Sequence, residues 1–243
     1  MYEPRDYRQL MQAKGLVSYN VTCQESDLQI FSASRLEDQV RGAILSARHQ
    51  LMTYMAQHPD FEKALAPLVP EAKAPDIIKE MCRAGSLTQV GPMAAVAGAI
   101  AKAVGDTLDS LSPEYIIENG GDLYLRTLSP KDIAIYAGDS PFSNQLAIRI
   151  SPQPKGLGVC TSSGQFGHSL SFGKADAVVV LSENPYLADA AATALCNAVQ
   201  GPDDVSAVLE QGKLIPGICG LLIIAQDALG LWGDMELVPF PQT

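Results

Sequence analysis

The sequence has no concentrated run of basic residues. Lys and Arg number 17 against 27 Asp and Glu, which gives a formal net charge of −10. Proteins that bind duplex nucleic acid neutralise its phosphates with clustered Lys and Arg. We therefore expect no nucleic-acid partner. A phosphate compound would have to be held by backbone N–H groups, a local basic side chain or a bridging metal ion.

Segments typical of export or membrane insertion are also missing. Residues 1–15 carry charges throughout and contain no apolar stretch of the kind that a secretory signal needs. The longest apolar stretches, residues 91–101 and 214–225, are shorter than the roughly 20 residues that span a bilayer. The sequence thus predicts a soluble, cytoplasmic protein with no membrane partner.

The chain has few cysteines, and their spacing does not suggest pairs. The chain has five cysteines, an odd number, and none of them has CxxC spacing. In a chain of this size this predicts reduced, mostly buried thiols, and it argues against a disulfide framework or a metal cluster. The 20 Gly and 16 Pro are scattered without a period, which excludes a collagen-like protein.

The chain does contain enough apolar residues for a large core, since 47% of its 243 residues are hydrophobic. Strand-like runs arrive in series instead of alternating with helices, which favours an α+β fold with mixed or antiparallel sheets packed with helices. The length allows one domain or two closely packed subdomains, and we treat residues 1–243 as a single domain. Strands are expected at 18–23, 28–33, 115–118, 123–126, 133–137, 146–150, 157–161, 177–181, 218–225 and 236–238, and helices at 34–58, 75–83, 93–108, 186–199 and 203–211.

Local signals predict where two of these helices begin and end. Ser34 and Glu37 have the Ser-x-x-Glu spacing of a capping box at the start of the first long helix. Pro75 suits the first position of the next helix, and Gly85 is a typical stop.

Four segments contain residues that suit chemistry, and the first is the small-residue stretch 90–105. A helix of small residues lets another backbone or a ligand approach closely. Its Gly-Pro entrance also points free N–H groups outward, as an anion site requires. Tight packing in the core explains the same residue types, and residue type alone favours that simpler interpretation.

The second segment is Glu118-Asn119-Gly120-Gly121-Asp122, which lies between two strand-like runs. Asn-Gly is a strong hairpin signal, so a tight turn is expected whatever the function. Two adjacent glycines also let the backbone approach a ligand without interference from a Cβ atom.

The third segment, residues 160–169, leaves a strand through a Thr-Ser-Ser-Gly loop and reaches His168. A serine hydrolase needs Gly-x-Ser-x-Gly on a strand-to-helix turn, whereas another strand follows this loop. The hydroxyls fit better as hydrogen-bond donors to a phosphate or a ring system. His168 is the candidate functional histidine, because His49 and His58 belong to the first long helix.

The fourth segment contains Asp189 and Thr193, the only polar side chains in an Ala/Leu-rich helix. Their spacing of four puts them on one face, where a carboxylate and a hydroxyl suit a hard, oxygen-seeking cation. Alternatively, Asp189 caps a helix start and Thr193 bonds back to the Asp189 carbonyl. Spacing alone favours this second interpretation.

Taken in order, the four segments resemble the ApbE-like proteins, the FAD:protein FMN transferases. The resemblance implies that one group of residues binds the flavin dinucleotide, that His168 is the catalytic base or a phosphate donor, and that Asp189 and Thr193 bind Mg²⁺. The implied dinucleotide-binding residues are Gly98, Lys102, Asn119, Gly120, Gly121, Asp122, Thr161, Ser162, Ser163 and Gly164.

A closer resemblance, over nearly the whole chain, is to an uncharacterised cytosolic branch of ApbE-related proteins. It rests on Glu25-Ser26-Asp27-Leu28, residues 90–94, Glu118 to Asp122 and residues 171–177. The chain departs from the transferases at residues 170–174, where they have Asp-Pro-x-Thr-Gly.

The implied activity is Mg²⁺-dependent transfer of FMN from FAD to a hydroxyl of an acceptor protein, by a homodimer. Two other functions stay open, namely a non-catalytic flavin- or nucleotide-binding protein and a dinucleotide pyrophosphate hydrolase.

Overall fold

The computed structural model describes residues 8, 11, 13–165 and 172–240. Its β-structure forms two sheets. The larger has eight strands in the order β1-β2-β3-β4-β7-β8-β9-β10, and the smaller has three in the order β11-β6-β5. All neighbouring strands pair in antiparallel fashion. The expected α+β fold is confirmed.

The elements have the following bounds. The strands are β1 (Val17–Cys23), β2 (Ser26–Ser32), β3 (Tyr115–Asn119), β4 (Asp122–Thr127), β5 (Lys131–Ala134), β6 (Leu146–Ile150), β7 (Gln153–Ser162), β8 (Ala177–Ser182), β9 (Ile218–Ala225), β10 (Ala228–Gly233) and β11 (Glu236–Pro239). The helices are α1 (Glu37–Gln57), α2 (Asp60–Lys63), α3 (Asp76–Thr88), α4 (Val96–Leu108), α5 (Pro185–Ala198) and α6 (Val205–Lys213), with 3₁₀ helices at Pro92–Ala95 and Pro202–Asp204.

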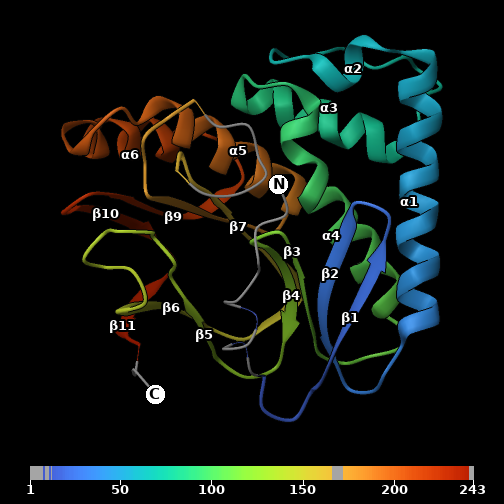
Figure 1. The fold of residues 1–243 in the computed structure, drawn as a ribbon, viewed down its shortest axis with the longest axis horizontal. Helices are drawn as coiled ribbons and strands as arrows, with labels where there is room; N and C mark the ends of the chain where they lie inside the picture. The colour runs from blue at the N-terminus through green and yellow to red at the C-terminus, as the bar shows by residue number, and fades with distance from the viewer. Residues whose placement is uncertain (1–7, 9–10, 12, 166–171, 241–243) are drawn as a thin grey trace.

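Helices cover one face of the large sheet, and the small sheet covers part of the other face (Figure 1). Strand β8 shows how the sequence builds both cores, because its side chains alternate in direction. Val178 and Val180 pack beneath α5 and α6, whereas Val179 and Leu181 face the small sheet. A third cluster lies between α1, α3, α4 and the strands β1–β4. Both faces of β8 are therefore buried, as its continuous apolar sequence indicates.

The start predicted for α1 and the end predicted for α3 are wrong. No side chain caps the start of α1, whose N-cap residue is Leu36, so Ser34 and Glu37 do not form a capping box. Helix α3 continues past Gly85 to Thr88 and is followed by the C-cap residue Gln89, which has a φ of 60°. Gly85 is needed inside the helix instead, because a Cβ atom there would lie 2.7 Å from the carbonyl oxygen of Val90.

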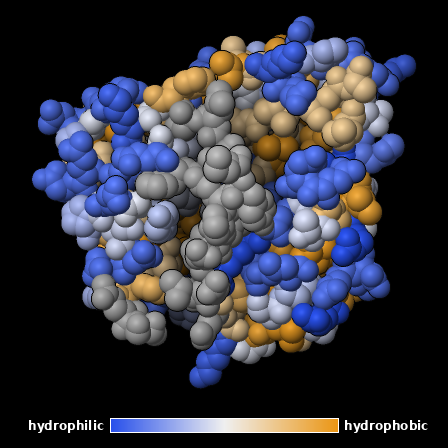
Figure 2. Space-filling view, viewed as in Figure 1, coloured by the Kyte–Doolittle hydropathy of each residue, from blue (hydrophilic) through white to orange (hydrophobic). Residues whose placement is uncertain are grey.

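The surface mixes hydrophilic and apolar side chains, as the face in Figure 2 shows. All five cysteines are free and four are buried, in agreement with the sequence pattern. In the described chain no single helix has both the length and the apolar character to cross a membrane. The one combination that has both, α3 followed by residues 92–108, is bent by 106°.

Candidate functional site

The hairpin of β3 and β4 brings the first site residues into position. Asn119 pairs with Asp122 across a two-residue turn. Gly120 and Gly121 have φ angles of 69° and 102°, in the left-handed region that favours glycine. The predicted tight turn is confirmed. Because Asn119 and Asp122 lie directly opposite each other, their side chains point to the same face of the sheet, towards the helices.

Both of these side chains are fixed by backbone groups of other elements. The Asn119 amide nitrogen donates to the carbonyl oxygen of Ala97 at the start of α4, over 3.1 Å. Asp122 Oδ1 accepts from the backbone nitrogen of Thr161 near the end of β7, over 3.0 Å. The turn is thus tied to α4 on one side and to β7 on the other.

Asp189 reaches the same place from α5. Its own helix is capped by Asn184, whose side chain accepts from the Tyr186 nitrogen. Asp189 Oδ2 instead accepts from the backbone nitrogen of Gly98 over 2.8 Å, and the Ala97 N–H also bonds the carboxylate. Asp189 therefore caps α4, which has no side-chain cap from its own flanking residue. The interpretation of Asp189 as a helix cap is correct, but the capped helix is α4.

Gly98 makes this contact between helices possible. A Cβ atom at Gly98 would lie 2.3 Å from the carbonyl oxygen of Pro185 and 3.1 Å from Asp189 Cβ. No larger residue fits unless α5 moves away. The structure thus supports the packing interpretation of the small residues in α4, and a role for Gly98 in ligand binding stays a prediction.

The two carboxylates, Asp122 and Asp189, lie in an environment that opposes their charge. Burial, together with the nearby Asp189 charge, raises the pKa of Asp122 well above its ordinary value. Burial raises the pKa of Asp189 to about 7, against the opposing effect of the Gly98 and Ala97 N–H groups. Over the described residues, neither carboxylate forms an ion pair with Lys or Arg. Within the part of the chain that the structure describes, no positive charge compensates the pair.

Cys160 is a member of this cluster that the sequence did not reveal. Its side chain is fully buried, its thiol donates to the Pro185 carbonyl oxygen over 3.8 Å, and the Asp122 carboxylate is close enough for its charge to act on the thiol. Burial and the charges of both carboxylates raise the pKa of Cys160 well above its usual range, so the thiol stays protonated. The alternation of β7 places Cys160 and Ser162 on the face that packs against α5.

Two hydroxyls complete the surroundings. Ser162 Oγ is buried and has no hydrogen-bond partner among the described residues. Thr193 is buried one helical turn after Asp189, and the hydrogen bonds of the described chain include none from Thr193 back to the Asp189 carbonyl. An unpartnered buried hydroxyl loses hydrogen bonds to water, so Ser162 suits contact with a bound group.

The other residues predicted for the site either bond to different partners or lie outside the residues that the structure describes. Lys102, one turn after Gly98, pairs with Asp106 and lies 5.7 Å from the ring centre of Tyr124. Gly164 donates its N–H to the Ala175 carbonyl over 2.9 Å, and Ser163 Oγ accepts from the Gln165 nitrogen. His168 lies outside the described residues.

The donors at this site are carboxylates and hydroxyls. In the described parts of the chain, no three His, Cys, Asp or Glu side chains form a group that could hold a metal ion. This composition does not suit Zn²⁺, which takes four Cys, His or carboxylate ligands in closed sites. It fits a cation such as Mg²⁺, which binds one or two carboxylates and completes its shell with water and substrate phosphate.

Two surface cavities are not lined by the carboxylate pair. One of about 290 Å³ is lined by Tyr54, His58 and Phe61 beside α2. Another of about 560 Å³ lies at the start of α5, next to Asn184 and Asp234. Asp122 and Asp189 are only 4% and 6% exposed and line neither cavity.

Comparisons with known proteins agree with the resemblance seen in the sequence. The family model described as "AbpE bacteria" matches residues 8–214. A UPF0280 protein of Methanothrix thermoacetophila is 43% identical over 201 residues, which cover 80% of this chain and 82% of that protein. A UPF0280 protein of Methanosphaerula palustris is 48% identical over 194 residues, with 79% and 80% covered.

Solved structures show the same fold at low identity. The flavin transferase ApbE from Vibrio cholerae superposes with a TM-score of 0.60 at 16% identity, covering 90% of this chain and 97% of that one. The flavinyl transferase ApbE from Pseudomonas stutzeri, in its apo form, gives 0.55 at 17% identity, with 92% and 94% covered. From the family match and these relatives, the chain belongs to the AbpE bacteria family and has the fold of the ApbE flavin transferases.

Proposed function

We propose that this protein binds a flavin-type dinucleotide together with a divalent cation, and that it transfers FMN from FAD to a hydroxyl of an acceptor protein. The observation that carries the proposal is the buried pair Asp122 and Asp189, which has no basic partner among the described residues. Two like charges in a buried site are costly unless a cation binds between or beside them. Mg²⁺ held by Asp122, Asp189 and Thr193 would offset the repulsion between the two carboxylates.

The net negative charge of the protein is a second reason to expect a bound cation. A dinucleotide brings a pyrophosphate with negative charges, and Lys102 is already paired with Asp106. When bound, Mg²⁺ supplies charge neutralisation to the pyrophosphate. The chain's own contributions would be backbone approach at Gly120 and Gly121 and hydrogen bonds from the hydroxyls of Thr161, Ser162 and Ser163.

The proposed reaction forms one bond and breaks one. The acceptor hydroxyl attacks the FMN phosphorus, a new P–O bond forms, and the pyrophosphate P–O bond breaks to release AMP. The hydroxyl proton passes to a general base, for which His168 is the candidate. Such chemistry depends on positioning and electrostatic stabilisation more than on a reactive side chain, which suits a site built from buried, hydrogen-bonded carboxylates.

The flavin transferase and the flavinyl transferase that share this fold support transfer over the two alternatives. A passive flavin-binding protein and a dinucleotide pyrophosphate hydrolase would nevertheless use the same residues. A single domain, a homodimer and a cytoplasmic location also stay predictions.

One experiment separates the three functions. Purified protein is incubated with FAD and Mg²⁺, with and without a protein extract as a source of acceptors, while AMP and protein-bound flavin fluorescence are measured. AMP release that requires the extract supports transfer, and AMP release without it supports hydrolysis. Binding of FAD without AMP supports the passive role. If neither flavin binding nor metal dependence is found, the proposal is wrong. Each measurement is repeated with Asp189→Asn, which should weaken the Mg²⁺-dependent effects if Asp189 binds the cation.

A further inference from the structure

Arg8 joins two carboxylates that are far apart in sequence. Its Nη1 donates to Asp27 Oδ2 over 2.7 Å, and its Nη2 donates to the Asp27 carbonyl oxygen over 2.7 Å. Its Nε donates to Glu118 Oε2 over 2.6 Å. The guanidinium is thus held by β2 on one side and by β3 on the other. The Arg8 side chain is only 8% exposed, so these are not solvent-screened surface contacts.

Glu118 connects Arg8 to the Gly120–Gly121 turn. Its second oxygen, Oε1, accepts from the backbone nitrogen of Gly121 over 2.9 Å. The Glu118 side chain is 1% exposed, so an ionised carboxylate there depends on its partners. A continuous set of hydrogen bonds therefore runs from Asp27 through Arg8 and Glu118 to the N–H of Gly121, the residue directly before Asp122.

The geometry favours Arg over any other residue at position 8. A guanidinium presents several N–H groups in one plane and can bond two carboxylates and a carbonyl at once, whereas a Lys ammonium is a single point of charge. The other carboxylate, Asp27, is held in turn by Thr22, whose Oγ1 donates to Asp27 Oδ1 over 3.0 Å. Asp27 also belongs to the Glu25-Ser26-Asp27-Leu28 segment that stood out in the sequence, and the cation–dinucleotide site does not use it.

We propose that Arg8 is a positioning residue, which fixes the Gly120–Gly121 turn through Glu118 and so holds Asp122 where the cation–dinucleotide site needs it. The proposal rests on the function proposed above for Asp122. It assigns to Arg8, through Glu118, a role in placing Asp122. A two-glycine turn is conformationally permissive, so without an external restraint it would sample several backbone states. The buried Arg8–Glu118 pair removes that freedom.

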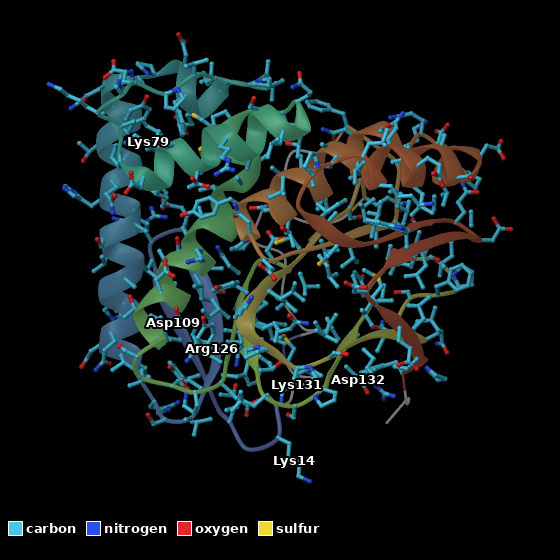
Figure 3. The ribbon with its side chains drawn as sticks, turned by 180° about the vertical axis from the view of Figure 1, so that it is seen from behind. Lys14, Lys79, Asp109, Arg126, Lys131 and Asp132 are labelled. Carbon is cyan, nitrogen blue, oxygen red and sulfur yellow. The ribbon has the colours of Figure 1, made fainter. Side chains whose placement is uncertain are left out.

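Arg126 provides a matched control at the opposite end of the same hairpin. It pairs with Asp109 over 2.8 Å, and it donates to the backbone carbonyls of Asp109 and Ser112. Figure 3 shows Arg126 and Asp109 side by side at the end of α4. Each arginine thus bonds an aspartate carboxylate and at least one backbone oxygen, but of the two only Arg8 is linked through Glu118 to the Gly121 N–H.

The test compares Arg8→Met with Arg126→Met by two measurements. The first is the hydrogen-exchange rate of the Gly121 amide in the ligand-free protein, followed by NMR. We expect it to rise about tenfold in Arg8→Met, because a hydrogen bond to a charged group is lost or loosened, and to stay unchanged in Arg126→Met. The second is the Kd for FAD in Mg²⁺, which we expect to rise about tenfold in Arg8→Met alone.

Each outcome decides the proposal. Equal exchange rates at Gly121 in the two variants, or an unchanged Kd in Arg8→Met, would overturn it. If the unaltered protein does not bind FAD, the proposed function fails, while the Gly121 rates still show whether Arg8 fixes the turn. If Arg8→Met does not fold, Arg8→Lys replaces it. That variant should keep the fold yet show faster Gly121 exchange, and a rate equal to that of the unaltered protein would refute the proposal.

Discussion

Asp189 Oδ2 lies 2.8 Å from the backbone nitrogen of Gly98, although 91 positions separate the two residues in the sequence. The contact joins α5 to the first turn of α4 and gives one carboxylate two roles. It caps a helix that lacks a side-chain cap of its own, and with Asp122 it forms the buried pair that we assign to cation binding. The roles are separable because an uncharged side chain of the same shape can still accept the Gly98 hydrogen bond.

Asp189→Asn should therefore weaken cation binding and leave the fold intact. The amide oxygen keeps the cap, whereas the anionic ligand is lost. We expect the Kd for Mg²⁺ to rise at least about tenfold, the equivalent of 1.4 kcal/mol, as measured by calorimetry. Asp106→Asn is the control, since Asp106 is a more exposed carboxylate that pairs with Lys102. An equal Kd in Asp189→Asn and in the unaltered protein would leave Asp189 with its capping role alone.

The free energy of unfolding should depend on pH because the pKa of Asp189 is raised in the folded protein. Its pKa is about 7 in the folded protein, against about 3.9 in an unfolded chain. Between these values the folded state binds more protons than the unfolded state. The free energy of unfolding should therefore fall as the pH rises from about 4 to about 7, and it should level off above.

The measurement is the thermal midpoint in EDTA at pH 5.5 and pH 8. We expect a lower midpoint at pH 8, a smaller difference between the two pH values in Asp189→Asn, and recovery at pH 8 when Mg²⁺ replaces EDTA. Because the Asp189 charge also raises the pKa of Asp122, the comparison reports the ionisation of the coupled pair, whereas titrations elsewhere in the protein cancel. The same pH difference in both would show that ionisation of Asp189 does not oppose folding.

Local patterns were enough to predict the parts of the site that depend on neighbouring residues. The Asn-Gly-Gly-Asp turn follows from backbone preferences over four residues, and the shared face of Asp189 and Thr193 follows from helical spacing. The boundaries of α5 were predicted to within one residue at each end. Strand β10 was missed because Gly230 and Gly233 interrupt its alternation and it pairs only with β9.

The partners of these residues could not be predicted, because each contact joins segments far apart in the chain. Nothing near Asp189 indicates that it caps α4, and nothing near Cys160 indicates that its thiol lies close to the Asp122 carboxylate. Gly85 shows the same limit. Its sequence context suggests a helix stop, but its lack of a side chain serves a close approach by the Val90 carbonyl.

Gly98→Ala should disturb the contact between α4 and α5. The added methyl group would lie 2.3 Å from the Pro185 carbonyl oxygen, so α5 must shift. We expect a loss of about 1–3 kcal/mol in the free energy of unfolding, typical of an overpacked core, together with weaker Mg²⁺ binding. Urea denaturation and calorimetry measure the two effects.

Gly42→Ala is the control for Gly98→Ala. Gly42 lies within α1, and a Cβ atom there would meet nothing within 4 Å. This substitution should stabilise the protein by about 0.5–1 kcal/mol, because alanine favours the helix, and it should leave Mg²⁺ binding unchanged. Similar losses of stability in both variants would show that the close packing at Gly98 has no special importance.

Ser162→Ala should separate stability from binding. Ser162 Oγ is buried without a hydrogen-bond partner among the described residues. Since such a group costs about 1–3 kcal/mol, its removal should leave the ligand-free protein equally stable or more stable. If the hydroxyl contacts the bound dinucleotide, the Kd for FAD in Mg²⁺ should rise several-fold in the same variant.

The matched control for this last prediction is Ser32→Ala. Ser32 is also buried, but its hydroxyl bonds both Tyr19 and the Ser34 carbonyl. Its replacement should lower the free energy of unfolding by about 1 kcal/mol or more, since the partners lose hydrogen bonds, and FAD binding should be unaffected. Opposite effects of the two substitutions on stability and on FAD binding would identify the Ser162 hydroxyl as a group kept for its ligand. Parallel effects would mean that Ser162, like Ser32, serves only the fold.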